Sequence, residues 1–236
     1  MRKILSALLL SATSALAQNN PTAYDALRAV GNQLNRDAIN RVVGISGVEG
    51  NPQPETWHIL LSDRNTPAGV REVDVTNGRV GTQRAPTRDL AGTARGATVD
   101  TRKLNLDSSG AYEVANKTAD SSHVPFAFVS YTLRTDDRGN PTWIVTLLSQ
   151  NRRALGTIYI GANKGTVTRT EGMFQGLPAN EVVEDQREGH VEYEARSGDG
   201  PIVGRARELF YRARDNARDT FKRVRRNFAD FIRGED

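Results

Sequence analysis

Residues 57–80, WHILLSDRNTPAGVREVDVTNGRV, decide the fold of this chain, and they recur in altered form at 143–167 as WIVTLLSQNRRALGTIYIGANKGTV. Each copy starts with a tryptophan at the head of an alternating apolar run, passes through a polar turn, and closes a second apolar run near a glycine. Alternation with a period of two predicts β-strands with one buried face. The distance from tryptophan to glycine is 21 positions in the first copy (57 to 78) and 22 in the second (143 to 165). Such a repeat predicts two small units of one architecture.

A helix is predicted before the first copy. The apolar residues that recur there at helical spacing are Ala23, Leu27, Val30 and Leu34. Asn20 and Pro21 suit the N-cap and the first helical position, because proline lacks the amide hydrogen that would have no partner there. A strand is expected over 41–48, with Val43 and Ile45 on one face. The first unit, residues 18–82, is therefore expected to be a helix followed by three or more antiparallel strands.

The second unit, residues 104–170, is predicted to repeat this order. Ser108 and Ser109 offer an N-cap to a weakly apolar helix, and three alternating runs then predict strands. The apolar residues expected on the inner face of these strands are Ala127, Val129, Tyr131, Leu133, Trp143, Val145, Leu147, Ile158, Ile160 and Ala162. Residues 83–103, between the units, are rich in arginine and glycine and predict an exposed linker.

The predicted fold class is α+β, with one helix covering the apolar face of an antiparallel sheet in each unit. A unit of about 60 residues buries a modest fraction of its surface and is marginally stable alone. We therefore expect the units to share a core, through either a continuous sheet or a groove between them. Trp57 and Trp143 are expected in equivalent positions, where core packing is favoured over a surface role because each begins an inward-facing series.

Each copy resembles the PepSY or PepSY-like domain of bacterial exported proteins and peptidase propeptides. The closing strand of that family ends Asp-Ala-x-x-Gly-x-Val, and the first copy reads Asp74-Val75-Thr76-Asn77-Gly78-Arg79-Val80. The second copy has Gly161 at the position of the aspartate, so a contact made by that acid is expected only in the first unit. The resemblance covers roughly residues 21–80 and 104–167. It implies tandem cystatin-like α+β units of a helix and three to four strands, no catalysis, and a binding role toward a secreted peptidase.

Residues 1–17 form a predicted signal peptide. Two basic residues precede a short apolar run, and Ala15 and Ala17 supply the small residues for cleavage before Gln18. The apolar run is far shorter than the roughly 20 residues that a membrane span needs. The chain has no cysteine, which excludes disulfides, thiolate catalysis and cysteine metal sites. These features predict a periplasmic or secreted protein.

The C-terminal third differs in charge from the rest. Residues 171–200 are acidic and predicted to be irregular, whereas 201–236 predict one long basic amphipathic helix. The whole chain carries +4, of which the signal peptide contributes +2 and 201–236, with ten Lys/Arg and six Asp/Glu, a further +4. Residues 18–200 therefore carry −2, so the basic character belongs to the C-terminal helix.

This predicted helix supplies the candidate contact residues of the chain. They are Leu209, Phe210, Arg214, Arg218, Phe221, Arg225, Phe228 and Phe231. Three docking modes are compatible with aromatic residues on one face and cations on the other: the body of the protein, a second copy, or an anionic membrane surface. Nucleic acid is disfavoured, because the protein is predicted to be exported and its body is acidic.

No catalytic, cofactor-binding or metal-binding residues are predicted. The histidines His58, His123 and His190 form no helical metal-binding pair, and His58 is expected to face solvent from its strand. The sequence holds no nucleophile-elbow or phosphate-loop motif. The expected function is a non-enzymatic binding module that modulates or inhibits a secreted or envelope peptidase. The alternatives are an envelope adaptor that acts on the membrane surface through the C-terminal helix, and a hydrolase with a dispersed triad.

Overall fold

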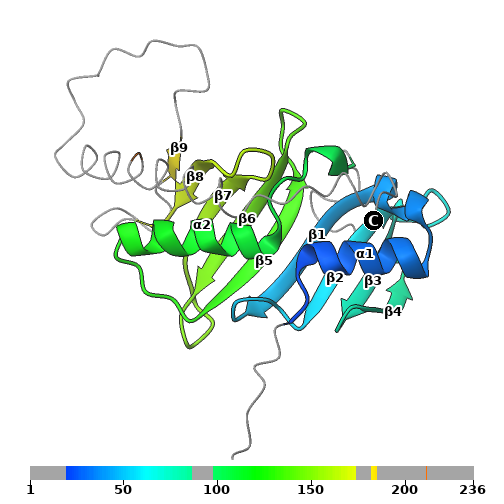
Figure 1. Ribbon diagram of the computed structural model, residues 1–236, viewed down its shortest axis with the longest axis horizontal. Helices are drawn as coiled ribbons and strands as arrows, with labels where there is room; N and C mark the ends of the chain where they lie inside the picture. The colour runs from blue at the N-terminus through cyan, green and yellow to red at the C-terminus, as the bar shows by residue number, and fades with distance from the viewer. Residues whose placement is uncertain (1–19, 87–97, 174–181, 185–210, 212–236) are drawn as a thin grey trace, which may run out of the picture.

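The chain folds as an α+β protein built on one antiparallel sheet. The computed structural model describes residues 20–86, 98–173, 182–184 and 211. Within these residues, nine strands form a sheet in the order β4-β3-β2-β1-β5-β6-β7-β8-β9. The helices α1 (Ala23–Gln33) and α2 (Ser108–Ser121) lie end to end on the same face of the sheet (Figure 1). The α+β class is confirmed, and the two units share a continuous sheet.

The first unit consists of α1, a 3-10 helix and four strands. The elements after α1 are η1 (Arg36–Arg41), β1 (Val42–Gly50), β2 (Thr56–Ser62), β3 (Val70–Thr76) and β4 (Arg79–Arg84). The N-cap of α1 is Thr22, whose hydroxyl accepts from Asp25 N while the Asp25 carboxylate accepts from Thr22 N. The predicted cap at Asn20 is therefore wrong by two residues, because this reciprocal capping box satisfies the free amides at the helix start.

A bulge disturbs the alternation at the start of β1. The register with β2 shifts between Val42 and Gly44, so Val42 and Ile45 both join the main core. The prediction that Val43 shares the core face of Ile45 is wrong, because a bulge changes which face each residue occupies.

The second unit repeats the order of one α-helix followed by four strands, but its 3-10 helix comes before the α-helix instead of after it. Its elements besides α2 are η2 (Thr101–Lys103), β5 (Phe128–Thr135), β6 (Pro141–Leu148), β7 (Ala154–Gly161) and β8 (Val167–Glu171). Asp107 caps α2, one residue before the predicted cap. A short strand β9 (Val182–Glu184) pairs with β8, in a segment that was predicted to be irregular.

Strands β1 and β5 join the two units at the centre of the sheet. Their ladder pairs Ile45 with Leu133 and Gly47 with Tyr131. Within the two units, Ile45 occupies the position of Tyr131, and Gly47 that of Leu133. Ile45 thus pairs with the equivalent of Gly47, and Gly47 pairs with the equivalent of Ile45. This reciprocal pairing is the pattern of an approximate two-fold axis between the units.

Both tryptophans are buried and hold the start of a helix against the sheet. Trp57 is 1% exposed and Trp143 is fully buried. Trp57 Nε1 donates to the carbonyl of Pro21 at 2.8 Å, and Trp143 Nε1 donates to the carbonyl of Leu106 at 2.8 Å. Each acceptor immediately precedes the N-cap of the helix in the same unit. The predicted equivalence of the tryptophans and their core position are confirmed.

The ladder also corrects the alignment of the two copies. Each tryptophan lies opposite the last inward-facing residue of the next strand, which is Val75 in the first unit and Ile160 in the second. Asp74 comes one residue before Val75, and Tyr159 comes one residue before Ile160, so these two residues are equivalent. The prediction that Gly161 holds the position of the aspartate is therefore wrong. The glycine-based alignment failed because the second copy has a longer turn before its last strand.

Three aromatic rings form the centre of a core that extends under both helices. The Tyr131 ring lies 5.6 Å from that of Trp57 and 6.1 Å from that of Trp143, and the two indoles are 6.4 Å apart. The Tyr131 hydroxyl donates to the carbonyl of Pro52 at 2.7 Å, and burial raises the pKa of this tyrosine well above its usual value. The edge-on and tilted arrangements are those that aromatic pairs favour. This cluster belongs to a single hydrophobic core to which both units contribute.

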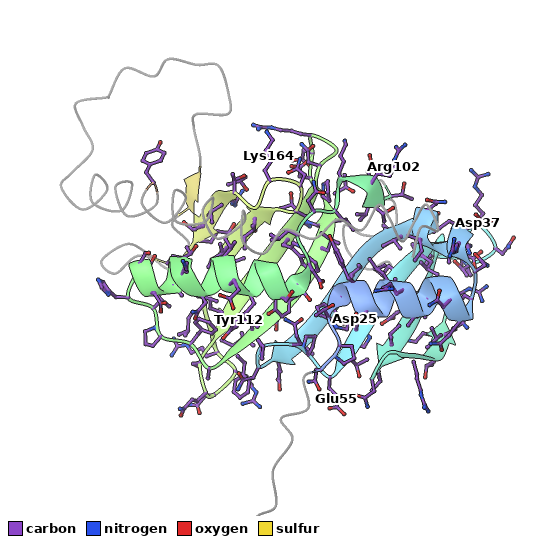
Figure 2. All side chains as sticks on the ribbon, in the orientation of Figure 1. Asp25, Asp37, Glu55, Arg102, Tyr112 and Lys164 are labelled. Atoms are coloured by element: carbon purple, nitrogen blue, oxygen red, sulfur yellow. The ribbon has the colours of Figure 1, made fainter. Side chains whose placement is uncertain are left out.

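A buried carboxylate joins the starts of the two helices, which face each other near Asp25 and Tyr112 (Figure 2). Asp107 Oδ1 accepts from Ser108 N at 2.6 Å and from Tyr24 N at 3.1 Å, so one side chain serves both helices. Positive helix ends stabilise such a carboxylate, whereas its burial raises the pKa of Asp107.

The predicted exposed linker over 83–103 is exposed at its first residues, as expected, but these residues form a strand, and at its other described end the predicted exposure is wrong. Residues 83 and 84 belong to β4. Val99 and Thr101 are buried, and Val99 N donates to the carbonyl of Val42 at 2.7 Å. An isolated valine in a polar stretch gave no periodic signal, so the sequence did not predict this contact.

Candidate functional site on the polar face of the sheet

The face of the sheet opposite α1 and α2 carries the outward side chains of the strands, and we call it the polar face. A single row crosses seven strands, each residue directly opposite the next: Asp74, His58, Ser46, Thr132, Ile144, Tyr159 and Arg169. Because neighbouring strands lie about 4.8 Å apart, this row is roughly 29 Å long. In Figure 1 the helices lie in front of the sheet, so the polar face is turned away from the viewer.

In the first unit, the polar face holds the His58 cluster, defined as His58, Glu72, Asp74 and Arg84. His58 Nδ1 lies 2.7 Å from Asp74 Oδ1 and 3.3 Å from Glu72 Oε1. The Arg84 guanidinium donates to both Glu72 oxygens at 2.7 and 3.1 Å, and it lies 3.4 Å from Asp74 Oδ2. The two carboxylate side chains are only 15% and 17% exposed, and the histidine is 31% exposed.

Electrostatics in this cluster are dominated by the two acids on β3. The hydrogen bond with Glu72 and the charges of Glu72 and Asp74 raise the pKa of Arg84. One guanidinium offsets two carboxylates, so the cluster carries a net charge of −1 when His58 is neutral. The Arg84 side chain is half-exposed on the edge strand β4, whereas the acids lie on β3, which is paired with a strand on each side.

In the second unit, the polar face holds the Arg169 cluster, defined as Tyr159, Arg169 and Glu171. Arg169 forms an ion pair with Glu171, and its guanidinium carbon lies 5.1 Å from the centre of the Tyr159 ring. The Tyr159 hydroxyl donates to Glu171 Oε1 at 3.1 Å. Partial burial and the neighbouring carboxylate raise the pKa of Tyr159. An aromatic ring and a guanidinium side by side are residue types that recur at binding surfaces.

Small hydroxyl side chains, together with the apolar Ile144, lie between the two clusters. The half-buried residues in this central part are Ser46, Ser130, Thr132, Thr146 and Thr157. The Thr146 and Thr157 hydroxyls lie 3.3 Å apart across β6 and β7. Hydroxyls donate and accept hydrogen bonds, so this region can recognise polar groups without adding charge.

Ser46, His58 and Asp74 are consecutive in the row and have the composition of a catalytic triad. The contact between His58 and Asp74 matches the base-orienting bond of such a triad. In the described residues, however, no hydrogen bond joins the Ser46 hydroxyl to His58. Ser46 also pairs within the β1 ladders, and backbone amides committed to a sheet do not provide the oxyanion donors that acyl transfer needs. Of the contacts that a serine triad uses, the described residues thus show the one between His58 and Asp74.

The C-terminal contact residues predicted from the sequence lie outside the described residues. These are Leu209, Phe210, Arg214, Arg218, Phe221, Arg225, Phe228 and Phe231. In that segment the structure describes only Tyr211, which is helical, half-buried and packed against the core. Of the C-terminal residues, Tyr211 is thus the one that the structure places against the body of the protein.

The sequence did not predict the His58 cluster as a unit. His58 was placed correctly on the polar side of its strand, but it was expected to face solvent alone. The signal that could have found the cluster is register: once β2 and β3 pair as a hairpin, His58 must lie opposite Asp74 and diagonal to Glu72. Residue spacing within a single strand does not contain this information.

Comparison with known proteins adds no relative: no family model, no curated protein and no solved structure matches this chain. Among the described residues, the structure contains no helix with the length and hydropathy to cross a membrane. The resemblance to PepSY domains thus rests on the motif and on the internal repeat.

Proposed function

We propose that this protein is an exported, non-enzymatic binding module that holds another protein against the polar face of its sheet. The observation that carries this proposal is the seven-strand row, which makes the two units one continuous surface. With a length of roughly 29 Å and strands of about 20 Å, the face measures about 600 Å², close to the roughly 800 Å² that each partner contributes to a standard interface.

The construction of the sheet supports recognition by a preformed surface. One core lies under both units, and both tryptophans fix a helix to the side opposite the polar face. A surface on paired strands loses little conformational freedom on binding, which favours affinity. Charged groups at the two ends and hydroxyls between them provide directional contacts that select a partner.

The partner class follows from the sequence. The predicted signal peptide places the protein in the periplasm or outside the cell, and the resemblance to tandem cystatin-like PepSY units makes a secreted or envelope peptidase the expected partner. The protein then modulates or inhibits that peptidase without catalysis of its own.

A second candidate function rests on the amphipathic pattern of 201–236. Aromatic residues on one face and arginines on the other suit an anionic membrane surface. In this role the protein is an adaptor at the envelope membrane, and the C-terminal helix is its anchor. Removal of 201–236 should then abolish co-sedimentation with anionic vesicles, and unchanged co-sedimentation contradicts this role.

A photo-crosslinking amino acid at Thr132, in the centre of the polar face, tests the main proposal in living cells. Asn32, exposed on α1, is the matched control position on the opposite side of the sheet. We expect one partner protein to crosslink from 132 and not from 32. Thr132→Arg should then weaken binding of the purified partner by about tenfold or more, equivalent to about 1.4 kcal/mol, while Asn32→Arg leaves it unchanged.

Equal crosslinking from both positions, or none from 132, contradicts the use of the polar face. Once the crosslinked partner is identified, its peptidase activity is measured with and without the purified protein. A partner that is not a peptidase, or a peptidase with unaltered activity, leaves the binding surface intact and rejects the inhibitory role.

A further inference from the structure

The His58 cluster brings three metal-ligating side chains to one point on adjacent strands. Ligand atoms of His58, Glu72 and Asp74 all lie within 4.8 Å of one another. In the part of the chain that the structure describes, no other group of three such side chains is this close. Two ligands held at about 2.1 Å from one ion in tetrahedral geometry lie about 3.4 Å apart. The distances of 2.7 and 3.3 Å from His58 Nδ1 to the two carboxylates are already near this spacing.

We infer that the His58 cluster is a binding site for a divalent transition-metal ion of the zinc type. The ligands are His58 Nδ1, one oxygen of Asp74 and one oxygen of Glu72. Because Nδ1 must offer its lone pair, the neutral imidazole carries its hydrogen on Nε2 in the bound state. This inference does not depend on the proposed binding function. If both hold, the bound ion forms part of the polar face.

Comparison of the two units argues against a purely structural role for these side chains. The same three positions in the second unit are occupied by Ile144, Thr157 and Tyr159. In the second unit the equivalent strands therefore pair without a histidine or an acid at these positions. Two carboxylates held side by side and mostly buried repel each other and lose hydration, a cost that the second unit avoids. A cation that binds between them offsets both effects.

Arg84 occupies the place of that cation in the described structure. Its guanidinium shares Glu72 Oε1 with the histidine, so it competes with a metal for the same oxygen. The Arg84 side chain comes from the edge strand β4 and is 51% exposed, which leaves it free to swing into solvent. This competition gives a specific expectation: removal of the guanidinium must strengthen metal binding, whereas removal of a ligand must weaken it.

The ligand types select the class of ion. One imidazole nitrogen with two carboxylate oxygens suits Zn²⁺ and its neighbours in the transition series. Ca²⁺ takes six to eight oxygen ligands and Mg²⁺ keeps a nearly octahedral oxygen shell, so this site favours neither. Three protein ligands leave one coordination position, which faces away from the sheet and is open to water or to a side chain of a partner.

Calorimetric titration of the untagged, chelator-treated protein with zinc sulfate tests the site. We expect one ion to bind per chain, with affinity reduced at least about tenfold in His58→Gln and in Asp74→Asn and increased in Arg84→Gln. His123→Gln is the matched control, because His123 is exposed outside the sheet, and it should bind zinc like the wild type.

Circular dichroism establishes that each variant is folded, and the imidazole ¹⁵N shifts of His58 provide a second measurement. Zinc should shift the Nδ1 resonance of His58 while the His123 resonances stay in place. Equal zinc affinity in wild type and His58→Gln, or no binding by the wild type at millimolar zinc, overturns the inference. Weaker binding in Arg84→Gln also overturns it, because it shows that the guanidinium is not a competitor.

Discussion

The two units share a backbone plan and an inner face but differ on the polar face. Inside, Trp57 and Trp143 donate the same hydrogen bond to the same position before a helix. Outside, a histidine and two acids in the first unit stand where the second has uncharged side chains. The requirements of the core keep the inner face alike, whereas folding leaves the polar face free to differ. The polar face is therefore where the two units can carry different chemistry.

The junction between the units shows a second kind of difference, which has a local packing cause. Gly47 occupies the position that Leu133 holds in the second unit. A Cβ atom on Gly47 would lie 2.4 Å from Pro54 Cγ and 3.0 Å from the Trp57 ring. Both neighbours belong to the first unit, so the turn at Pro54 and the indole of Trp57 leave no room for a side chain at position 47. The asymmetry at this position is a packing solution and carries no functional signal.

The largest expected effect comes from truncation of either tryptophan. Trp57→Ala and Trp143→Ala should each destabilise the protein by about 3–5 kcal/mol, the range for loss of a large buried side chain. Because one core connects both units, unfolding should remain a single transition in each variant. Urea denaturation followed by far-UV circular dichroism measures this. Two separate transitions, with only one shifted, contradict the shared core and show that the units fold independently.

The next largest effect compares the two helix caps. Asp107→Ala removes acceptors for both helix starts and should cost about 2–3 kcal/mol, whereas Thr22→Ala removes one cap and should cost about 1 kcal/mol. The same denaturation experiment measures both values. Equal losses at the two positions contradict the assignment of Asp107 to both helices and make it an ordinary cap.

How much of this the sequence could predict depends on the range of the interactions. Alternating apolar residues predicted the strands and both buried tryptophans, because local periodicity reports which face is buried. The pairing of His58 with Asp74 joins residues 16 positions apart, and the hydrogen bond that the Tyr24 amide donates to Asp107 joins residues 83 positions apart. Those contacts follow from register and from packing between units, neither of which leaves a local pattern. The fold class was therefore accessible from the sequence, and the polar clusters were not.

The charge of Asp107 should appear in the pH dependence of stability. Burial raises its pKa above 3.8 in the folded protein, so between 3.8 and the raised value the folded state binds more protons than the unfolded state. The contribution of Asp107 to the free energy of unfolding is then present at low pH. It is lost as the pH rises through the pKa that Asp107 has in the folded protein. Asp107→Asn keeps an acceptor oxygen and removes this dependence, so its stability relative to wild type should improve as pH rises from about 4 to 7. A constant difference over that range contradicts the raised pKa.

The smallest expected effect comes from the backbone conformation of the tight turn between β3 and β4 in the first unit. Gly78 has a φ of 71° between β3 and β4, and no atom lies within 4 Å of a Cβ placed on it. Gly78→Ala should therefore destabilise the protein by about 1 kcal/mol through left-handed strain alone. Gly139, with a φ of 75° and equally open surroundings in the second unit, is the matched control and should respond alike. Asparagine tolerates this conformation, so Gly78→Asn should lose less stability than Gly78→Ala in the same denaturation experiment. If alanine is neutral at Gly78 and costly at Gly139, the left-handed backbone of the turn between β3 and β4 does not limit stability.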